Sequence, residues 1–476
     1  MKNILLLLAI TAASAQAQAP TATPADPHES ALGADFRLER KRFSEACGTL
    51  SFKSAAGCAV QLFTDHPFHI AASSIAPQNG FGLGAAFVTH YTPNESWRLS
   101  WNFDVVASTN ASWRAGAYMK MIHTPVENVK PVVPEPGEAP KPIKLPVVHP
   151  YTVFNLYAQS ISLNQLNYFD LGPDSGVAGK SLFGMQQTIV GFSAIKPIYK
   201  WAPIHKLNLS LIGQVNARFV NLRGRHGQST PSIKTLYTEA TAPGLANQPP
   251  FLQLEEGVRV KPTLFKENLQ LNYVVNFQEF FAPSTSQYNF QRWTVDLNHS
   301  IPLHTHTVSY APKDSNGPDE CGTDNNATCP PVSYSRNLQG SVNFRLLVSE
   351  SFHSSSVPFY FQQTLGGSDI NGVPSLSSFQ DYRFRGPNLL LLRESFEHSI
   401  WGPLGFQFLA DQGKVAFTRS DLGFSHLKHS FSAGLTLRAG GFPMVSFLYA
   451  WGGEGSHTIG SLNTSLLGGS SRPPLD

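Results

Sequence analysis

The sequence contains few charged residues. Aspartate, glutamate, lysine and arginine make up only 14% of its 476 residues, whereas hydrophobic residues make up 41%. Soluble domains usually carry roughly 25% charged residues, so we expect much of the surface not to face water. The formal net charge of +3 gives no strong basic field, and a nucleic-acid partner is therefore not expected.

Long apolar runs are also missing beyond the first residues. After residue 19 no apolar stretch approaches the roughly 20 residues that a membrane-spanning helix needs, which excludes insertion as helices. The chain begins MKNILLLLAITAASAQAQA, in which Lys2 precedes an apolar stretch and the small residues Ala15 and Ala17. This order is typical of a secretory signal peptide, so we expect residues 1–17 to be cleaved from an exported protein.

Cysteine is scarce, and the four that occur are Cys47, Cys58, Cys321 and Cys329. An even number of cysteines in an exported protein predicts disulfides, here Cys47 with Cys58 and Cys321 with Cys329. A zinc site that adds His66 and His69 to the first pair is an alternative. The wide gap between Cys47 and Cys58 is unlike the C-x2–4-C spacing of zinc ligands, so the disulfides are the preferred interpretation.

Recognisable motifs for catalysis or ligand binding are absent as well. The stretch GVAGKS at 176–181 has Asp174 where a phosphate-binding loop needs its first glycine. The acidic stretch 314–326 lacks the spacing and final glutamate of a calcium-binding loop, and no G-x-S-x-G motif occurs. We expect no enzyme, no cofactor and no metal site. A serine and a histidine brought together only by folding, as in an outer-membrane lipase, are the alternative.

What the sequence does have is an alternation of apolar and polar residues with a period of two. In the stretch RLSWNFDV, residues 98–105, every second residue is apolar. Similar alternation occurs at 206–219, 269–277, 292–298, 338–348 and 429–438. Because successive side chains of a strand point to opposite faces, each stretch is predicted to be a strand with one apolar and one polar face.

The length of these stretches favours a membrane barrel over a soluble β-sandwich. Tilted strands that cross a bilayer need roughly 9–11 residues, whereas strands of soluble sheets usually have about 5–6. The polar faces consist mostly of Asn, Gln, Ser and Thr, which suits a water-filled lumen. The sequence therefore predicts an all-β fold, a transmembrane antiparallel β-barrel over residues 80–467. A segment at 18–79 precedes it and a tail at 468–476 follows it.

The last part of the chain also resembles a known family. The stretches concerned are FYFQQTLGGSD (359–369), YRFRGPNLLLLRESFEHSI (382–400), FLADQGKVA (408–416) and LTLRAGGFPMVSFLYAWGGEG (435–455). In order and spacing they resemble the barrel of the bacterial surface antigen family, the BamA/TamA superfamily of outer-membrane proteins. The resemblance implies about 16 strands, a weak seam between the first and last strands, and a plug loop that folds into the lumen.

In that family an arginine of an L-R-G-F motif in the plug loop lies against an acidic strand residue. The candidate plug-loop residues of this chain are Asp369, Ser377, Ser378, Phe379, Arg383 and Arg385. Since serines stand where the family has arginine and glycine, Arg383 or Arg385 is expected to supply the positive charge. Glu394 and Asp411 are its expected partners. The segment 18–79 is too short for a chain of periplasmic POTRA domains.

The function implied is that of a non-enzymatic outer-membrane protein in membrane biogenesis or in the translocation of proteins or solutes. Its expected location is the outer membrane of a Gram-negative-type bacterium. Outer-membrane lipid and nascent outer-membrane or exported proteins are the expected partners. A passive or gated porin-like channel, and a surface adhesion protein that uses its long outer loops, are the alternatives.

Overall fold

The structure is a computed structural model that describes residues 37, 40, 41, 44, 67–127, 147–148, 150–198, 207–225, 227, 229–262, 268–309, 333–439, 442–462 and 472–476. The chain divides into the units Met1–Gln61 and Leu62–Asp476, and all the strands lie in the second unit. The four cysteines, His66 and the signal peptide lie outside the described residues. The disulfide pairing and the cleavage site therefore stay predictions.

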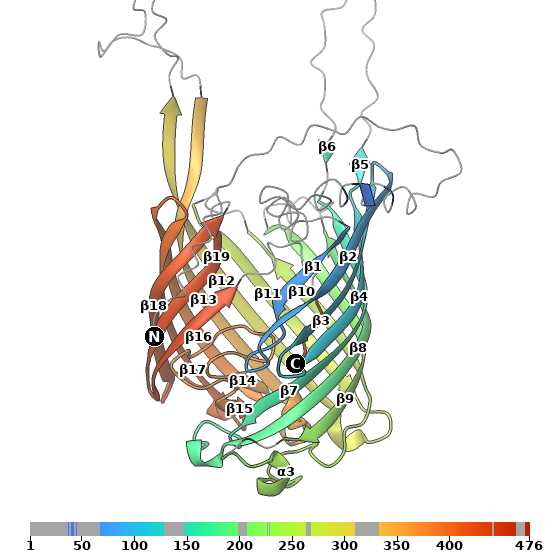
Figure 1. Cartoon of the computed structure of the whole chain (residues 1–476), viewed down its shortest axis with the longest axis vertical. Coiled ribbons are helices and arrows are strands. Elements are labelled where there is room, and N and C mark those ends of the chain that lie inside the picture. The colour runs from blue at the N-terminus through green and yellow to red at the C-terminus, as the bar shows by residue number, and fades with distance from the viewer. Residues whose placement is uncertain are drawn as a thin grey trace, which may run out of the picture. The chain divides into compact units, whose positions relative to one another are not determined.

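One antiparallel sheet of sixteen strands dominates the second unit (Figure 1). In sheet order the strands are β1 (Phe68–Ser74), β2 (Phe81–Asn94), β3 (Trp97–Ser108), β4 (Trp113–His123), β7 (Thr152–Tyr168), β8 (Ser181–Pro197), β9 (Leu209–Gly224), β10 (Phe251–Val260), β11 (Gln270–Phe281), β12 (Phe290–Ser309), β13 (Ser333–Phe352), β16 (Asn388–Trp401), β17 (Leu404–Ala416), β18 (Lys428–Ala439), β19 (Phe442–Gly452) and β20 (Gly455–Leu462). Each strand pairs with its neighbours in this order, which confirms the predicted all-β, antiparallel class.

The sheet begins earlier than the sequence analysis predicts. Strand β1 starts at Phe68, within the segment that was expected to precede the barrel, and pairs along its whole length with β2. At the other end β20 pairs with β19 as far as Leu462. Among the described residues no pairing joins β1 to β20, so these two strands are the edges of the sheet.

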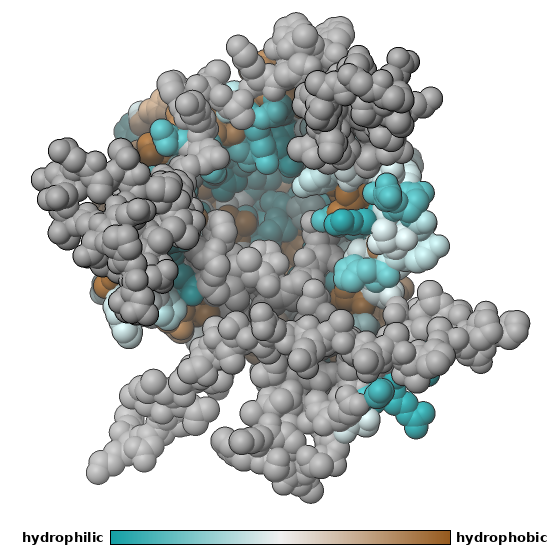
Figure 2. Space-filling model, turned by 90° about the horizontal axis from the view of Figure 1, so that it is seen from above, coloured by the Kyte–Doolittle hydropathy of each residue, from teal (hydrophilic) through white to brown (hydrophobic). Residues whose placement is uncertain are grey.

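The two faces of the sheet have the opposite polarity from those of a soluble protein. In β3, Trp101 and Phe103 are exposed, whereas Asn102 and Asp104 between them are buried. Strand β18 repeats this order, because Leu435 and Leu437 are exposed and Thr436 between them is buried. Seen from above, the part of the inner wall that is visible carries many hydrophilic residues (Figure 2). The sheet therefore curves around a polar inner face and turns an apolar face outward.

Among the described residues of the second unit, helix is nearly absent. The α-helix α3 (Ile233–Leu236) spans a single turn in the connection between β9 and β10. In the ranges that the structure describes, no helix has the length and apolar character needed to cross a membrane.

The apolar core lies at one end of the inner face. We call six of its rings the aromatic cluster, namely Tyr168, Phe183, Phe280, Phe290, Phe359 and Phe361. The rings of Phe280 and Phe290 stack with their centroids 4.3 Å apart, and Phe361 lies 5.2 Å from Phe280. Phe359 meets the rings of Tyr168 and Phe183 edge-on. Because Phe359 and Phe361 belong to the connection after β13, this packing fixes that connection against β7, β8, β11 and β12.

Candidate functional site

The connection between β13 and β16 returns along the inner face, and we call residues 359–386 the inner loop. It contains its own two-stranded sheet of β14 (Gln363–Leu365) and β15 (Phe384–Gly386). Between these strands Leu376 and Tyr382 are almost completely buried. The inner loop is therefore packed against the inner face over most of its length, and residues 371–373 at its tip are exposed.

Two glycines make the reversal after β14 possible. Gly366 and Gly367 have φ angles of +106° and +60°, a region in which only glycine avoids a steric penalty. A Cβ on Gly366 would lie 2.5 Å from the Cβ of Arg383, and one on Gly367 would lie 2.4 Å from Asp381. The GGSD stretch quoted above thus brings the two halves of the inner loop into direct contact.

Backbone groups of the inner loop bond to polar side chains of β17 and β18. The Leu376 N–H donates to Oδ2 of Asp411 at 2.9 Å, and the Ser378 N–H donates to Oγ of Ser430 at 2.8 Å. Asp411 also accepts two hydrogen bonds from the Arg393 guanidinium, at 2.7 and 2.9 Å. Asp411 is therefore a partner of the loop, but it holds the loop backbone and not a loop arginine.

The loop arginines have other partners than those expected. Arg383 forms an ion pair with Glu454, with Nε 2.6 Å from Oε1, and also donates to the hydroxyl and carbonyl of Ser175. Arg385 donates to the Phe359 carbonyl at 2.7 Å. Glu394 is exposed and lies one position along β16 from Arg393, so it points to the outer face. The expected arginine partners Glu394 and Asp411 are thus replaced by Glu454.

The remaining candidates of the inner loop are buried or half-buried. Ser377, Ser378 and Phe379 are nearly fully buried, and the ring of Phe379 packs edge-on against Phe384 at 5.1 Å. Asp369 is half-buried, and its Oδ1 accepts from two backbone N–H groups of the loop tip, those of residues 371 and 373. These contacts stabilise the local turn.

Several of the charged side chains on the inner face form ion pairs. Besides the pairs of Arg383 and Arg393, the pairs are Arg114 with Asp104, Arg345 with Asp296, and Arg438 with Glu397. Buried charges are tolerated when they are paired and hydrogen-bonded. The inner face therefore combines paired charges with buried apolar clusters.

Three buried arginines differ, and we call Arg218, Arg292 and Arg385 the inner arginines. Within the described ranges none of them has a carboxylate at ion-pair distance. They bond instead to amide and carbonyl oxygens and a hydroxyl, and they lie over rings of the aromatic cluster at 5.4–5.9 Å. At short range their positive charge is offset by dipoles and ring faces, and the Asp476 carboxylate acts on all three electrostatically.

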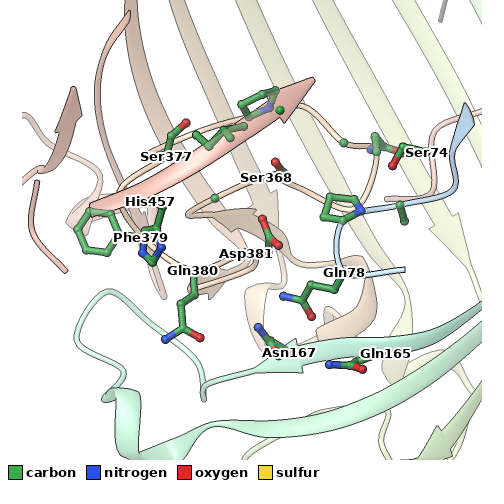
Figure 3. A pocket seen from close by; sticks show the side chains of 18 of the residues that line it. Ser74, Gln78, Gln165, Asn167, Ser368, Ser377, Phe379, Gln380, Asp381 and His457 are labelled. Atoms are coloured by element: carbon green, nitrogen blue, oxygen red, sulfur yellow. The ribbon is translucent and has the colours of Figure 1, made fainter. Parts of the chain in front are cut away.

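A cavity of about 670 Å³ opens between the two edges of the sheet, and we call it the seam cavity (Figure 3). Ser74 of β1 and His457 of β20 line opposite sides, and Gln380 and Asp381 of the inner loop lie between them. Lys180 donates to Oε1 of Gln380 at 2.7 Å. Burial raises the pKa of Asp381. The cavity is thus polar, and residues of both edge strands, of β7 and of the inner loop line it.

The structure gives no support for the ligand motifs considered from sequence. Residues 176–181 form a short turn, with the 3-10 helix η1 at Val177–Gly179, between β7 and β8. In the described part of the chain no three His, Cys, Asp or Glu side chains are grouped so as to hold a metal ion. The acidic stretch 314–326 lies outside the described residues.

Sequence reasoning missed Glu454 and the role of the inner arginines. Arg218 was placed on the polar face of its predicted strand by the alternation alone, and Arg292 begins the alternating stretch 292–298. That signal predicts which face an arginine occupies. It does not predict that three arginines from distant strands and the inner loop converge on one ring cluster.

Comparison with known proteins gives distant likenesses only. No family model and no curated protein matches the sequence. Among solved structures, CdiB from Acinetobacter baumannii is 11% identical with a TM-score of 0.42, over 82% of this chain and 58% of that one. BamA from Haemophilus ducreyi lacking POTRA domains 1–3 is 8% identical with a TM-score of 0.42, over 89% of this chain and 81% of that one. CdiB from Escherichia coli is 10% identical with a TM-score of 0.42, over 86% and 69%.

Proposed function

We propose that this protein is a non-enzymatic outer-membrane β-barrel of the surface antigen type, which acts in outer-membrane biogenesis or in the translocation of proteins or solutes. The observation that carries the proposal is the inverted polarity of the sheet, with exposed apolar residues such as Phe103 and Leu435 outside and buried polar residues inside. Burial of such an outer face in lipid removes it from water. Closure of the sheet at the β1–β20 seam belongs to the same proposal.

The inner loop supports a role as a plug within this barrel. It packs against the inner face through Asp411 and Ser430, and a plug in that position restricts free passage through the lumen. An always-open porin-like channel is therefore the less favoured alternative. The seam cavity, lined by both edge strands, favours a protein whose barrel accepts polypeptide or opens sideways.

The test of membrane insertion is fractionation of the mature chain together with its heat-modifiable migration in gels. We expect recovery in the outer membrane and faster migration before boiling, since closed barrels resist unfolding in detergent. Arginine in place of Leu435 on the outer face should lower folding yield, at a cost of roughly 2–4 kcal/mol at mid-membrane. Recovery as a soluble monomer without detergent contradicts the proposal.

The test of the plug is single-channel conductance in planar bilayers. We expect deletion of residues 370–380 to raise conductance, and Arg383→Ala to raise it less, because the ion pair with Glu454 anchors only one end of the inner loop. Unchanged conductance in both variants excludes a plug. Co-purification of nascent barrel proteins distinguishes an assembly role from conduction alone.

A further inference from the structure

A short segment from the end of the sequence lies on the inner face. Residues 472–476, which we call the tail segment, follow β20 in the chain but contact β3 and β9. The Arg472 guanidinium lies 2.8 Å from Oδ2 of Asp104. Arg218 donates from Nη2 to the Pro474 carbonyl at 3.0 Å. The tail segment therefore spans the space between an acidic side chain on β3 and one of the inner arginines on β9.

The other end of the tail segment bonds to the tip of the inner loop. The Leu475 N–H donates to Oδ1 of Asn371 at 2.8 Å, and Nδ2 of Asn371 donates to the Asp476 carboxylate at 2.5 Å. The Leu475 side chain is 5% exposed and belongs to the same buried apolar cluster as Phe361. The two hydrogen bonds of the Asn371 amide and the buried Leu475 side chain together fix the position of the tail segment on the inner face.

The charge of the site complements the tail segment. The inner arginines Arg218, Arg292 and Arg385 have no carboxylate partner within the described ranges, yet all three interact electrostatically with Asp476. Nη1 of Arg218 and Nε of Arg385 are buried without a hydrogen-bond partner. Besides Asp476, the carboxylates of Glu255 and Asp369 act on this group of charges. The unpartnered N–H groups of the inner arginines favour an occupant that brings a carboxylate and carbonyl oxygens.

The composition of the tail segment suits it to occupy such a site. Pro473 and Pro474 restrict the backbone to extended conformations, so little conformational entropy is lost when the segment is ordered. Pro474 offers only its carbonyl to the protein, and Arg218 uses that carbonyl. The peptide is thus pre-organised for the contacts it makes.

We propose that the inner arginines, with Asn371 and Asp104, form a binding site for an extended peptide that carries a carboxylate, and that residues 472–476 occupy this site as an internal ligand. The tail segment would also narrow the lumen beside the inner loop. Only this consequence rests on the proposed function, because it requires a membrane barrel. The ligand class is a peptide in which a basic residue is followed by proline, then by an apolar residue and last by a residue with a carboxylate.

Binding is tested with a variant that lacks residues 472–476 and a fluorescent peptide Arg-Pro-Pro-Leu-Asp with a blocked amino end. We expect the peptide to bind the variant in detergent and not the full chain, whose site is filled. The matched control peptide, Arg-Pro-Pro-Leu-Asn, should bind about tenfold more weakly, because a hydrogen bond to a charged group is lost. Equal binding of the two peptides, or no binding, contradicts the inference.

The consequence for the lumen is tested by conductance and by reversal potential in a salt gradient. We expect the deletion to raise conductance and anion preference, and the added peptide to reverse both. Asp476→Asn in the full chain, which removes only the carboxylate, should shift anion preference in the same direction. If the variants insert and show heat-modifiable migration but conduct as the full chain does, the internal-ligand inference is wrong and the proposed function still stands. Failure of the full chain to enter membranes contradicts the proposed function instead.

Discussion

The inner loop and the tail segment both lie on the inner face, but they are held in different ways. The inner loop is continuous with strands at both ends and carries Phe359 and Phe361, each 0% exposed. The tail segment is held by a few polar contacts and one buried leucine. Buried aromatic rings are worth about 3–5 kcal/mol each and single hydrogen bonds about 1 kcal/mol. The loop is therefore part of the fold, whereas the tail segment behaves as a ligand.

The largest effect is expected from Phe361→Ala. This change empties a site between Phe280 and Phe251, with which the ring is in contact, and should lower the free energy of unfolding by about 3–5 kcal/mol. Denaturant titration in detergent measures the change. Phe424→Ala is the control, because this ring is 71% exposed and its loss should cost at most about 0.5 kcal/mol. Similar losses from the two variants would show that the inner loop is not packed as described.

The next largest loss of stability is expected from Asp411→Asn, which tests the assignment of the inner and outer faces of β16 and β17. It leaves Arg393 without its carboxylate and weakens the acceptor for the Leu376 N–H, so we expect a loss of about 3 kcal/mol. Glu394→Gln is the matched control on the outer face and should change the free energy of unfolding little. If Glu394→Gln is the more destabilising variant, the assignment of the two faces is reversed.

A smaller effect concerns pH and the contact between loop and tail segment. Burial, and then the Asp476 carboxylate, raise the pKa of Asp369 to about 7, while the backbone N–H groups of residues 371 and 373 and the Arg345 guanidinium oppose the shift. The folded protein thus retains a proton that the unfolded chain loses near about pH 4. Stability is therefore lost as the pH rises from about 4 through about 7.

We expect the tail segment to bind less tightly at about pH 8 than at about pH 6, because ionised Asp369 then repels Asp476. Conductance should rise over this range in the full chain and stay level in Asp369→Asn. An equal rise in that variant assigns the pH dependence to another group.

The smallest effect on stability is expected from Arg472→Ala. Asp104 keeps its ion pair with Arg114 when Arg472 is removed, so the loss should be about 0.5 kcal/mol. Conductance should nevertheless increase, since one end of the tail segment is released. If Arg472→Ala lowers the free energy of unfolding as much as Phe361→Ala does, the tail segment is a structural part of the fold and not a ligand.

The alternation of the sequence predicted the strand class and the two faces because it is a local property. Trp101 and Phe103 face outward as the period of two requires. Strand β1 was missed because FHIAASS is short and does not alternate cleanly. Its place in the sheet depends on pairing with β2, which supplies the partner register.

The local sequence pattern could not predict which residues of the candidate site contact one another. Glu454 lies between β19 and β20, and it meets Arg383 only because the inner loop crosses the curved sheet. The sequence of the tail segment contains two prolines and no periodicity, so it reads as an extended piece of chain. Its docking on Arg218 and Asn371 depends on charges contributed by strands far apart in the sequence.

An even number of strands also gives the protein a definite sidedness. The chain joins the sheet at the start of β1 and leaves it after β20 at the same rim, which is also the rim where β5 (Val126–Glu127) and β6 (Val147–Val148) lie and where β12 connects to β13 (Figure 1). In a sheet that spans a membrane, the start of β1 and the connection between β12 and β13 therefore face the same compartment.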